Sequence, residues 1–492
     1  MVRGGTIWGA NAVNGVINII TRDASETRGN GATLVAGTEN QLVTAARHGG
    51  RLAGGAGNYR VYGKFRRLGP NVFASGESAR DPMALGQFGV RLDSEVERTS
   101  RWSLQGNVYR GNEGVFERDD TEVRGGFVSG LWTRRLSPGA EFQARAYYDH
   151  THRTVPLQFD EGRHTAAVDV QHGVALGTRH NLIAGGEVRV STARDVGSST
   201  LLFDPERRTN TVGGIFVQDE IAVTPALFVT LGSKFERNDY TGFEVQPTVR
   251  LRWSRGDRQT VWGAVSRAVR LPTRLDTDLR ILPGPTSQTE IRGNENFRAE
   301  SAVAYESGYR VRPHARVSVD VAAFVNRYDD LRSQELMTSD AGTSVLLGNT
   351  LNATTRGVEA ASNVQLLDRW RLRGSYTYLH KRFSTDPGSL DPTGGRSEGN
   401  DPPFFATLRS YLDLPQSLSF DVFFRYVDAR PLPVVPSYSS LDLRLGWGLR
   451  PGWELSVIGQ DLLQGSHPEF GTPGPRRIEY QRGIHVRSTW LF

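Results

Sequence analysis

The sequence predicts an all-β fold: a 22-stranded antiparallel transmembrane β-barrel preceded by a short N-terminal segment of different character. Three observations support this prediction. Apolar and polar residues alternate with a period of two along most of the chain, two kinds of connection alternate between these segments, and tryptophan gathers beside one kind. A run of about 18 apolar residues, which a transmembrane helix would need, does not occur.

The composition agrees with a barrel and excludes several other classes. The 492 residues are 38% hydrophobic with a mean hydropathy of -0.42, and in a barrel only alternate strand residues face lipid. The absence of cysteine excludes disulfides, thiolate metal sites and a cysteine nucleophile. The net charge of +6 arises from interleaved acids and bases, so there is no clustered basic face for nucleic acid. Only three of the 59 basic residues are lysines, which fits an arginine-lined lumen as well as a GC-rich genome.

The strands are predicted from the alternation. In residues 441–449 every odd position is Leu or Trp, and the even positions are Asp, Arg or Gly. Residues 227–234, 317–326 and 484–492 repeat the pattern. Each such segment is a strand with one apolar and one polar face.

The connections set the number of strands. Ten are tight, at residues 53–57, 96–101, 137–139, 177–180, 224–226, 254–257, 312–315, 368–369, 415–416 and 450–452. Eleven others lie between them, and most are longer, notably residues 68–84, 193–208, 268–298, 330–351 and 383–400. These 21 connections imply 22 strands, with short turns on one rim and long loops on the other.

Tryptophan provides an independent test. Trp490 is two residues from the C-terminus, and seven of the other eight tryptophans lie within five residues of a short turn: Trp102, Trp132, Trp253, Trp262, Trp370, Trp447 and Trp453. We expect all eight at one membrane interface as an aromatic belt. The alternative, core anchors of a soluble β-sandwich or propeller, would need a repeat of about 40–50 residues, which is absent.

Residues 1–24 are rich in glycine and small residues and include a strand-like stretch at 16–20. They resemble the closing segment of the plug domain of TonB-dependent outer-membrane receptors. The residues that carry this resemblance are Arg3, Gly4, Gly9, Ala10, Asn14, Gly15, Val16, Asn18, Ile19, Ile20 and Thr21.

Further matches to this family follow in order along the chain, at residues 216–220, 266–273, 293–310, 356–363, 375–379, 438–447 and 459–471. The terminal Phe492 resembles the aromatic signal that outer-membrane barrels present to their assembly machinery. The order and spacing of these matches make the resemblance specific, although each match alone is weak.

The resemblance implies a plug remnant at residues 1–24 and a receptor barrel at 25–492, in the outer membrane of a Gram-negative bacterium. It implies a monomer in contact with outer-membrane lipid that actively takes up a ferric siderophore or another metal chelate, bound between extracellular loops and plug. The energy would come from an inner-membrane TonB complex. No cofactor is implied.

The chain departs from the family in one respect. Family members begin with a signal peptide, a TonB box and a complete plug, and residues 1–24 contain none of these three in full. The sequence is therefore expected to be a fragment that does not transport substrate alone.

Histidine is unevenly distributed. Five of the ten histidines fall within 31 residues: His150, His152, His164, His172 and His180. His150 and His152 share a strand face next to Asp149, so these three residues are candidate ligands for a metal or metal chelate. The alternative is a polar lumen face without a ligand. Loop residues that could contact a ligand, or could simply be solvated, are Asp276, Asp278, Tyr328, Asp329, Asp330 and Phe404.

Catalytic motifs are absent from the sequence: there is no His-Glu-x-x-His, Walker or Gly-x-Ser-x-Gly pattern. We therefore expect no enzyme. Two alternatives to a receptor stay open. A passive porin explains the strands but not residues 1–24, and a soluble β-rich enzyme would need a catalytic cluster that the sequence lacks.

Overall fold

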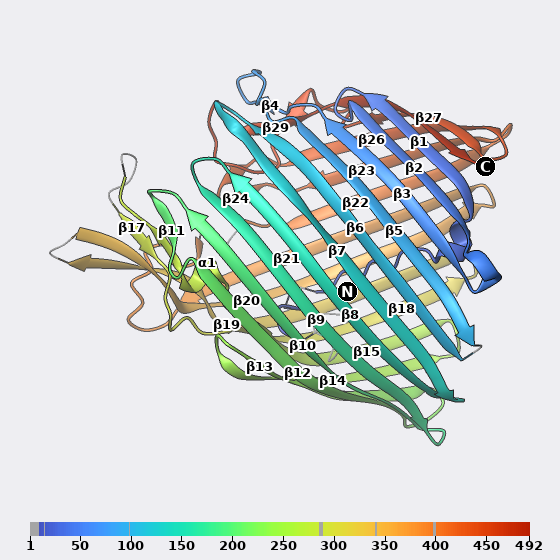
Figure 1. Ribbon diagram of the computed structural model, residues 1–492, viewed down its shortest axis with the longest axis horizontal. Helices are drawn as coiled ribbons and strands as arrows, with labels where there is room; N and C mark the ends of the chain where they lie inside the picture. The colour runs from blue at the N-terminus through green and yellow to red at the C-terminus, as the bar shows by residue number, and fades with distance from the viewer. Residues whose placement is uncertain (1–8, 14, 98, 285–288, 340–341, 397–399) are drawn as a thin grey trace.

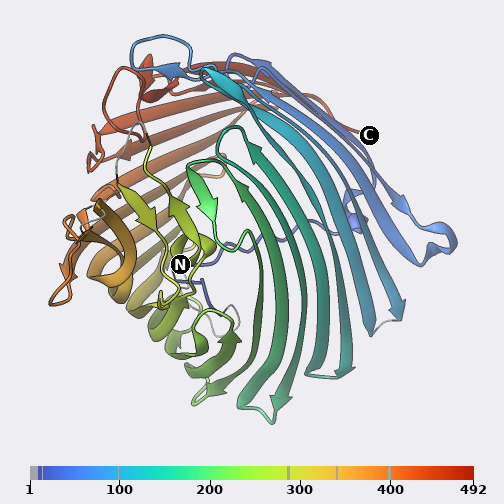
Figure 2. The same cartoon turned by 60° about the vertical axis from the view of Figure 1, so that its left-hand side comes forward.

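The computed structural model describes residues 9–13, 15–97, 99–284, 289–339, 342–396 and 400–492, and it is a closed antiparallel β-barrel (Figures 1 and 2). The prediction of 22 wall strands is confirmed. The wall strands are β1 (Gly29–Gly37), β2 (Leu42–Arg51), β3 (Gly57–Leu68), β5 (Met83–Glu97), β6 (Ser100–Val115), β7 (Arg118–Ser137), β8 (Ala140–Val155), β9 (Phe159–Leu176), β10 (His180–Gly197), β12 (Arg207–Ala222), β13 (Leu227–Asn238), β14 (Gly242–Arg255), β15 (Gln259–Arg270), β18 (Glu300–His314), β19 (Val317–Ser339), β20 (Gly342–Leu367), β21 (Trp370–Thr385), β22 (Phe404–Leu414), β23 (Leu418–Val427), β26 (Tyr438–Arg450), β27 (Trp453–Gln460) and β30 (Gly483–Leu491).

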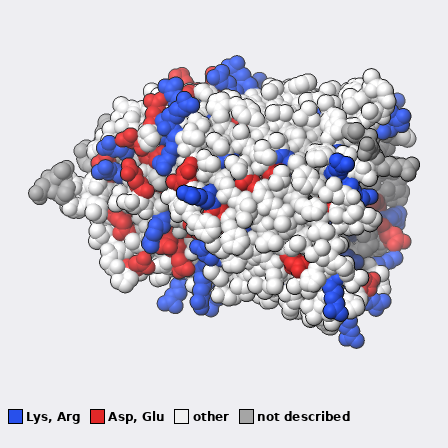
Figure 3. All heavy atoms as spheres, turned by 60° about the horizontal axis from the view of Figure 1, so that its bottom comes forward, with Lys and Arg blue, Asp and Glu red and all other residues white. Residues whose placement is uncertain are grey.

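The barrel closes between its first and last strands. β1 pairs with β30 in an antiparallel register that runs from Gly31 opposite Leu491 to Gly37 opposite His485. Alternation then sorts side chains between the two faces. On β9, Val168 is exposed on the outside, and the next residue, Asp169, faces the lumen, where its carboxylate lies 3.8 Å from Arg145. Figure 3 shows the charged side chains gathered toward the two ends of the face in view, with few between.

The two rims differ as the sequence predicts. On one rim ten connections have two to five residues, and on the other six connections are longer, the longest being residues 271–299. The predicted loop at 330–351 is wrong: β19 and β20 continue there as a hairpin, with Leu331 opposite Leu351. Their pairing continues past the rim because it satisfies the backbone groups of both strands.

Three short strands in the loops join the wall. β11 (Leu201–Phe203) pairs with β16 (Leu279–Ile281), β16 pairs with β17 (Glu290–Arg292), and β17 lies parallel to β20. With β11, β16 and β17 the continuous sheet has 25 strands. We call these three strands, with the part of β20 that they contact, the loop sheet. It connects three of the loops on one rim.

Smaller elements cover the rest of this rim. β4 (Val72–Phe73), β29 (Ile478–Gln481) and β28 (Ser466–His467) join one loop early in the chain to the last loop. β24 (Arg430–Pro431) and β25 (Val434–Val435) form a hairpin of their own. The single α-helix of the described residues, α1 (Arg274–Thr277), lies in the 271–299 loop. Among the described residues no helix is long and apolar enough to cross a membrane.

The N-terminal segment runs inside the barrel before β1 begins (Figures 1 and 2). It ends in a short 3-10 helix, η1 (Ala24–Thr27); a second, η2 (Ala53–Gly55), lies in the turn after β2. The predicted strand at residues 16–20 is wrong, because no described backbone pairs with it. Ile17, Ile19 and Ile20 are 81–90% exposed. A strand-like sequence does not make a strand without a neighbouring backbone to accept its hydrogen bonds.

The eight tryptophans lie at the short-turn ends of their strands, as predicted. Seven share the outward face with exposed apolar residues; for example, Trp132 follows Val128 on β7. Trp453 and Trp490 stack across β27 and β30 with ring centroids 6.5 Å apart. Trp262 is the exception, because it lines a lumenal pocket with Glu306. The belt therefore has seven outward members.

Candidate functional site

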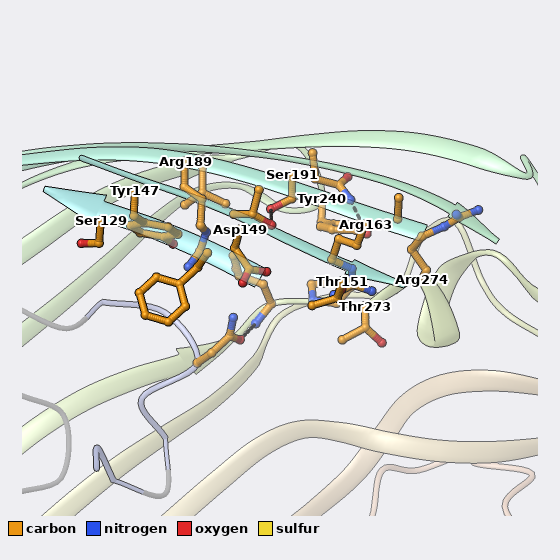
Figure 4. A pocket seen from close by; sticks show the side chains of 18 of the residues that line it. Ser129, Tyr147, Asp149, Thr151, Arg163, Arg189, Ser191, Tyr240, Thr273 and Arg274 are labelled. Carbon is orange, nitrogen blue, oxygen red and sulfur yellow. Dashed lines mark hydrogen bonds between the residues drawn. The ribbon is translucent and has the colours of Figure 1, made fainter. Parts of the chain in front are cut away.

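A pocket of about 770 Å³ lies in the lumen toward the long-loop rim. Its wall comes from β6 to β10 and β12, and residues 271–274 and Asn11 form its inner side (Figure 4). The lining side chains that the argument uses are Phe127, Arg145, Tyr147, Asp149, Arg163, Arg189, Tyr240 and Arg274. The strand wall, a loop and the N-terminal segment thus meet around one space.

The strand wall of the pocket is positively charged. Arg145, Arg163 and Arg189 reach it from β8, β9 and β10, and the carboxylate among them is Asp149. They share the space because inward-facing residues alternate along neighbouring antiparallel strands. Arg163 is half exposed although its Nη2 lies 2.8 Å from Glu161. Guanidinium groups with accessible N–H donors bind carboxylate and other oxygen-rich anions in a bidentate manner.

Aromatic side chains complete the lining. Tyr147 lies on β8 between Arg145 and Asp149, and Tyr240 comes from the connection after β13. Burial raises the pKa of the Tyr240 hydroxyl, which accepts a hydrogen bond of 2.9 Å from Asn210 Nδ2. The Arg208 guanidinium lies 4.7 Å from its ring centroid. The pocket can therefore hold a flat or ring-shaped anion between aromatic faces and arginines.

The 271–299 loop begins where β15 ends, and its first residues line the lumenal pocket. β15 loses its pairing with β14 after Ser266 but stays paired with β18 up to Arg270. Val269 and Leu271 then pack on Val212 in a small apolar core. Asn11 fixes the meeting point, because its N–H donates to the Val269 carbonyl at 2.7 Å and its Oδ1 accepts from Leu271 N at 2.9 Å.

Buried ion pairs hold α1 against the wall. Arg274, 6% exposed, donates to the Asp195 carboxylate and, at 2.8 Å, to Asp278 Oδ2. Asp276 is fully buried, and its Oδ2 accepts from Arg270 Nη1 at 2.9 Å. Burial opposes its charge, but the hydrogen bonds from Arg270 and Thr273 hold the pKa of Asp276 below its usual range. The sequence analysis named Asp276 and Asp278 as residues that could contact a ligand. In the structure both carboxylates are instead paired with arginines.

The structure separates the three residues predicted to bind metal. Asp149 faces the pocket, whereas His150 and His152 lie on the outward face of β8. His150 stacks on His164 with ring centroids 4.3 Å apart, and His152 Nε2 lies 3.2 Å from Asp160. The physical reason is the period of two, which places neighbours in a strand on opposite faces. No group of three or more His, Cys, Asp or Glu among the described residues could hold a metal ion.

The plug-like motif is described in part. Arg3, Gly4 and Asn14 lie outside the described residues, whereas Gly9, Ala10, Gly15, Val16, Asn18 and Thr21 lie in the lumenal segment. Gly9 has a φ of +69°, and a Cβ there would collide with Lys234 Nζ. Thr21 Oγ1 accepts from Arg91 Nη1 at 2.7 Å. The segment is therefore held by contacts with the barrel wall at both of its ends.

Lys234 forms a buried charge cluster beside this segment. Its side chain is 1% exposed, and its Nζ lies 2.5 Å from Glu187 and 3.8 Å from Glu236. Glu236 Oε2 also accepts from the backbone N–H of Ala10 at 3.4 Å. The cluster thus connects the barrel wall to the N-terminal segment.

At the C-terminus Phe492 follows β30, and its side chain is 75% exposed. Its N–H donates to the Asn30 carbonyl at 3.0 Å, and its own carbonyl accepts from Asn30 N at 2.5 Å. The backbone of the last residue is therefore hydrogen-bonded to Asn30, the second residue of β1. Its predicted role as an assembly signal stays a prediction.

Sequence reasoning missed Arg145, Arg163, Arg189 and Asn11 as pocket residues. The alternation could have assigned the three arginines to polar strand faces, but neighbouring strands had no known register. Asn11 carried no signal of its own.

A second charge cluster joins the last loop to the ends of β23 and β26 on the same rim. Glu469 Oε1 accepts from Arg425 Nη2 at 2.6 Å and lies 3.3 Å from Nε2 of the buried His467. The His467 ring stacks on Tyr438 with centroids 4.4 Å apart. The hydrogen bond from His467 and the nearby charge of Arg425 lower the pKa of Glu469, and burial raises it. The net result is a pKa of about 2.

This cluster predicts a pH dependence. Because the pKa of Glu469 is lowered from 4.5 to about 2, its contribution to stability is present above pH 4.5 and is lost as the pH falls toward 2. Over this range the difference in thermal midpoint between wild type and E469Q should shrink toward zero. E117Q, which alters the exposed Glu117 3.4 Å from Arg476, is the control and should show no such convergence. A constant difference between wild type and E469Q from pH 6 to 2 would contradict the assignment.

Comparisons with known proteins agree with this architecture. The family model described as TonB dependent receptor-like, beta-barrel matches residues 17–462. The iron-regulated outer membrane virulence protein of Vibrio cholerae is 22% identical over 76% of this chain and 60% of its own length. The ferric enterobactin receptor of Pseudomonas aeruginosa is 22% identical over 78% of this chain and 63% of its own length. The chain thus spans about 60% of these relatives.

Solved structures share the fold over the whole chain. The siderophore receptor PirA from Acinetobacter baumannii superimposes with a TM-score of 0.82 at 15% identity, covering 100% of this chain and 84% of that one. The copper transporter OprC gives a TM-score of 0.79 at 13% identity, with the same coverage. Since the family model spans most of the 492 residues, the protein belongs to the family of TonB-dependent receptor-like β-barrels.

Proposed function

We propose that the chain is the barrel of an active importer that takes up an anionic metal chelate of the ferric siderophore class. The observation that carries the proposal is the lumenal pocket lined by Arg145, Arg163 and Arg189. It opens toward the long-loop rim, where a chelate from outside the cell would arrive. Relatives named for iron regulation and for ferric enterobactin support this class of substrate.

The chain is an outer-membrane protein, as its family and its outward apolar face require. The passive-porin alternative is not favoured, because the family is one of receptors. Under the proposal, residues 1–24 are the end of a plug domain and residues 25–492 are the barrel, which acts as a monomer. A TonB complex in the inner membrane supplies the energy by pairing with a segment of the receptor.

The chemistry of the pocket suits an oxygen-rich anion. Three guanidinium groups from adjacent strands can each donate two parallel hydrogen bonds, and Phe127 and Tyr147 offer apolar ring surface beside them. Asp149 limits the net positive charge and accepts hydrogen bonds from ligand hydroxyls. These features favour a chelate that combines aromatic or ring-shaped groups with exposed oxygens.

The proposal is tested by binding of ferric enterobactin to the chain in detergent. In the double variant R163Q/R189Q the dissociation constant is expected to rise at least tenfold, because two charge-assisted contacts are removed. The control is R250Q, an arginine of a different lumenal pocket, which should stay within twofold of wild type. Equal affinity of wild type and the double variant for ferric enterobactin, ferric citrate and haem would refute the pocket as the substrate site.

A further inference from the structure

A groove of about 950 Å³ with a mostly apolar lining runs across the outward face of the first strands of the barrel. It begins beside Trp490 on β30, crosses β1, β2, β3 and β5, and ends at Val108 and Arg110 on β6. Gly63 on β3 forms part of its floor, and a Cβ built there has no neighbouring atom within 4 Å. The groove is therefore open because no large side chain fills this position.

The Arg110 end of the groove lies at the edge of the apolar band that faces lipid. Gln105 and Phe127 line the lumenal pocket, so the even-numbered residues of β6 and β7 face outward. On β6 the outward positions 104, 106 and 108 are Leu, Gly and Val, and the next is Arg110. On β7 the outward positions 130, 128 and 126 are Gly, Val and Gly, and the next is Arg124. The two arginines are therefore at the depth of lipid headgroups, on the long-loop side.

The charges of these two arginines are incompletely compensated. Arg110 and Arg124 are directly opposite each other in the β6–β7 register, and like charges in such a pair repel. Arg110 Nη2 lies 3.6 Å from Glu122 Oε2, but the two side chains are 77% and 62% exposed, so this pair is weak. Arg124 has no ion pair within the described part of the chain. On its other side it is opposite His152, which lies 3.2 Å from Asp160.

We propose that the groove and this arginine pair bind one molecule of an anionic, phosphate-bearing membrane lipid. An acyl chain occupies the groove, and the phosphate lies between the guanidinium groups of Arg110 and Arg124. Arginine forks bind phosphate oxygens in a bidentate manner, and an anion between the two cations removes their repulsion. The apolar stems of the arginines pack along the barrel surface, while their charged ends reach the headgroups. The site is on the outside of the wall and does not rest on the proposed import function.

The length of the groove suits an acyl chain. From β30 to β6 the groove crosses five spacings between paired strands, which is roughly 24 Å. The chains of one lipid span half of the hydrocarbon core of a bilayer, about 15 Å. One chain can therefore lie along the groove while its headgroup stays beside Arg110.

The test is native mass spectrometry of the folded 492-residue chain in detergent, with phosphatidylglycerol as the probe. We expect wild type to retain one tightly bound phosphatidylglycerol. R110Q/R124Q should raise its dissociation constant at least tenfold, because two cations at headgroup depth are removed. The matched control R134Q/R255Q removes two exposed arginines at the short-turn ends of β7 and β14 and should stay within twofold of wild type. Phosphatidylcholine, whose choline compensates its phosphate, should bind equally to wild type and R110Q/R124Q.

A second variant fills the groove and keeps both arginines. G63L places an apolar side chain on the open floor of the groove and should raise the dissociation constant of phosphatidylglycerol about tenfold. Its control is G130L on the outward face of β7, outside the groove, where a Cβ meets only Leu104 at 4.0 Å; this variant should stay within twofold. Glycerol 1-phosphate, which carries the phosphate without a chain, should compete at least a hundredfold more weakly than the lipid.

Three results would overturn the proposal. The first is wild-type affinity for phosphatidylglycerol in R110Q/R124Q or in G63L. The second is an equal loss of affinity in R134Q/R255Q, which would show an effect of overall charge. The third is competition by glycerol 1-phosphate as strong as that of the lipid, which would show a site for free phosphate. Heat-modified mobility on gels confirms that each variant is folded before the measurement.

Discussion

R274M is expected to destabilise the barrel by about 3–5 kcal/mol and to release the 271–299 loop from the lumen. Arg274 is 6% exposed, and its partners Asp195 and Asp278 are 5% and 3% exposed. Removing the guanidinium leaves Asp195 as a buried carboxylate without its ion-pair partner, which costs more than the lost attraction alone. The measurements are the free energy of unfolding in detergent and the rate of proteolysis within residues 271–299.

Two variants separate the buried charge from general effects of arginine loss. R292M alters a half-exposed arginine 3.8 Å from Glu290 in the same loop and should cost less than about 1 kcal/mol. R274K keeps the charge but loses the fork whose Nε reaches Asp278 while its Nη1 reaches Asp195, so it should fall between R274M and wild type. Wild-type stability and protease resistance in R274M would contradict the role of this residue.

K234M is expected to cost a similar 3–5 kcal/mol and to loosen the N-terminal segment. The Lys234 ammonium lies between Glu187 and the buried Glu236, so its removal leaves both carboxylates without this ion-pair partner. Because Glu236 also accepts from Ala10, the effect should reach that segment. Unfolding of the chain in detergent gives the cost, and proteolysis before residue 24 reports the release.

The control for K234M is K64M, which changes an exposed lysine and should alter stability by less than about 0.5 kcal/mol. The triple variant K234M/E187Q/E236Q should recover part of the lost stability, because it removes the uncompensated charges. If the triple variant is less stable than K234M, the lysine stabilises the barrel by packing rather than by charge.

Much of the fold could be predicted because its determinants are local. Alternation in residues 441–449 predicts a strand with one outward face, and tight turns such as 137–139 and 368–369 predict where the chain reverses. These signals depend on neighbours in sequence, and they gave the correct number of strands. The stretch at 16–20 shows the limit, because its pattern is that of a strand but its pairing depends on a distant backbone.

The site was less predictable because it depends on register between strands. Asp149 and His150 are adjacent in sequence yet lie on opposite sides of the wall, and His150 meets His164 only because of the β8–β9 register. Arg274 and Asp195 are 79 residues apart and meet because the 271–299 loop turns inward. No local pattern encodes such distant contacts.

The loop sheet links three of the loops at the mouth of the barrel into one structural unit. β11, β16 and β17 continue the pairing of the wall as far as β20, so three loops share one set of backbone hydrogen bonds. A displacement of the 271–299 loop must either carry its neighbours along or break those bonds. This side of the barrel mouth is therefore expected to open in one concerted step. The resistance of the loops to displacement is set by the sheet rather than by any single loop.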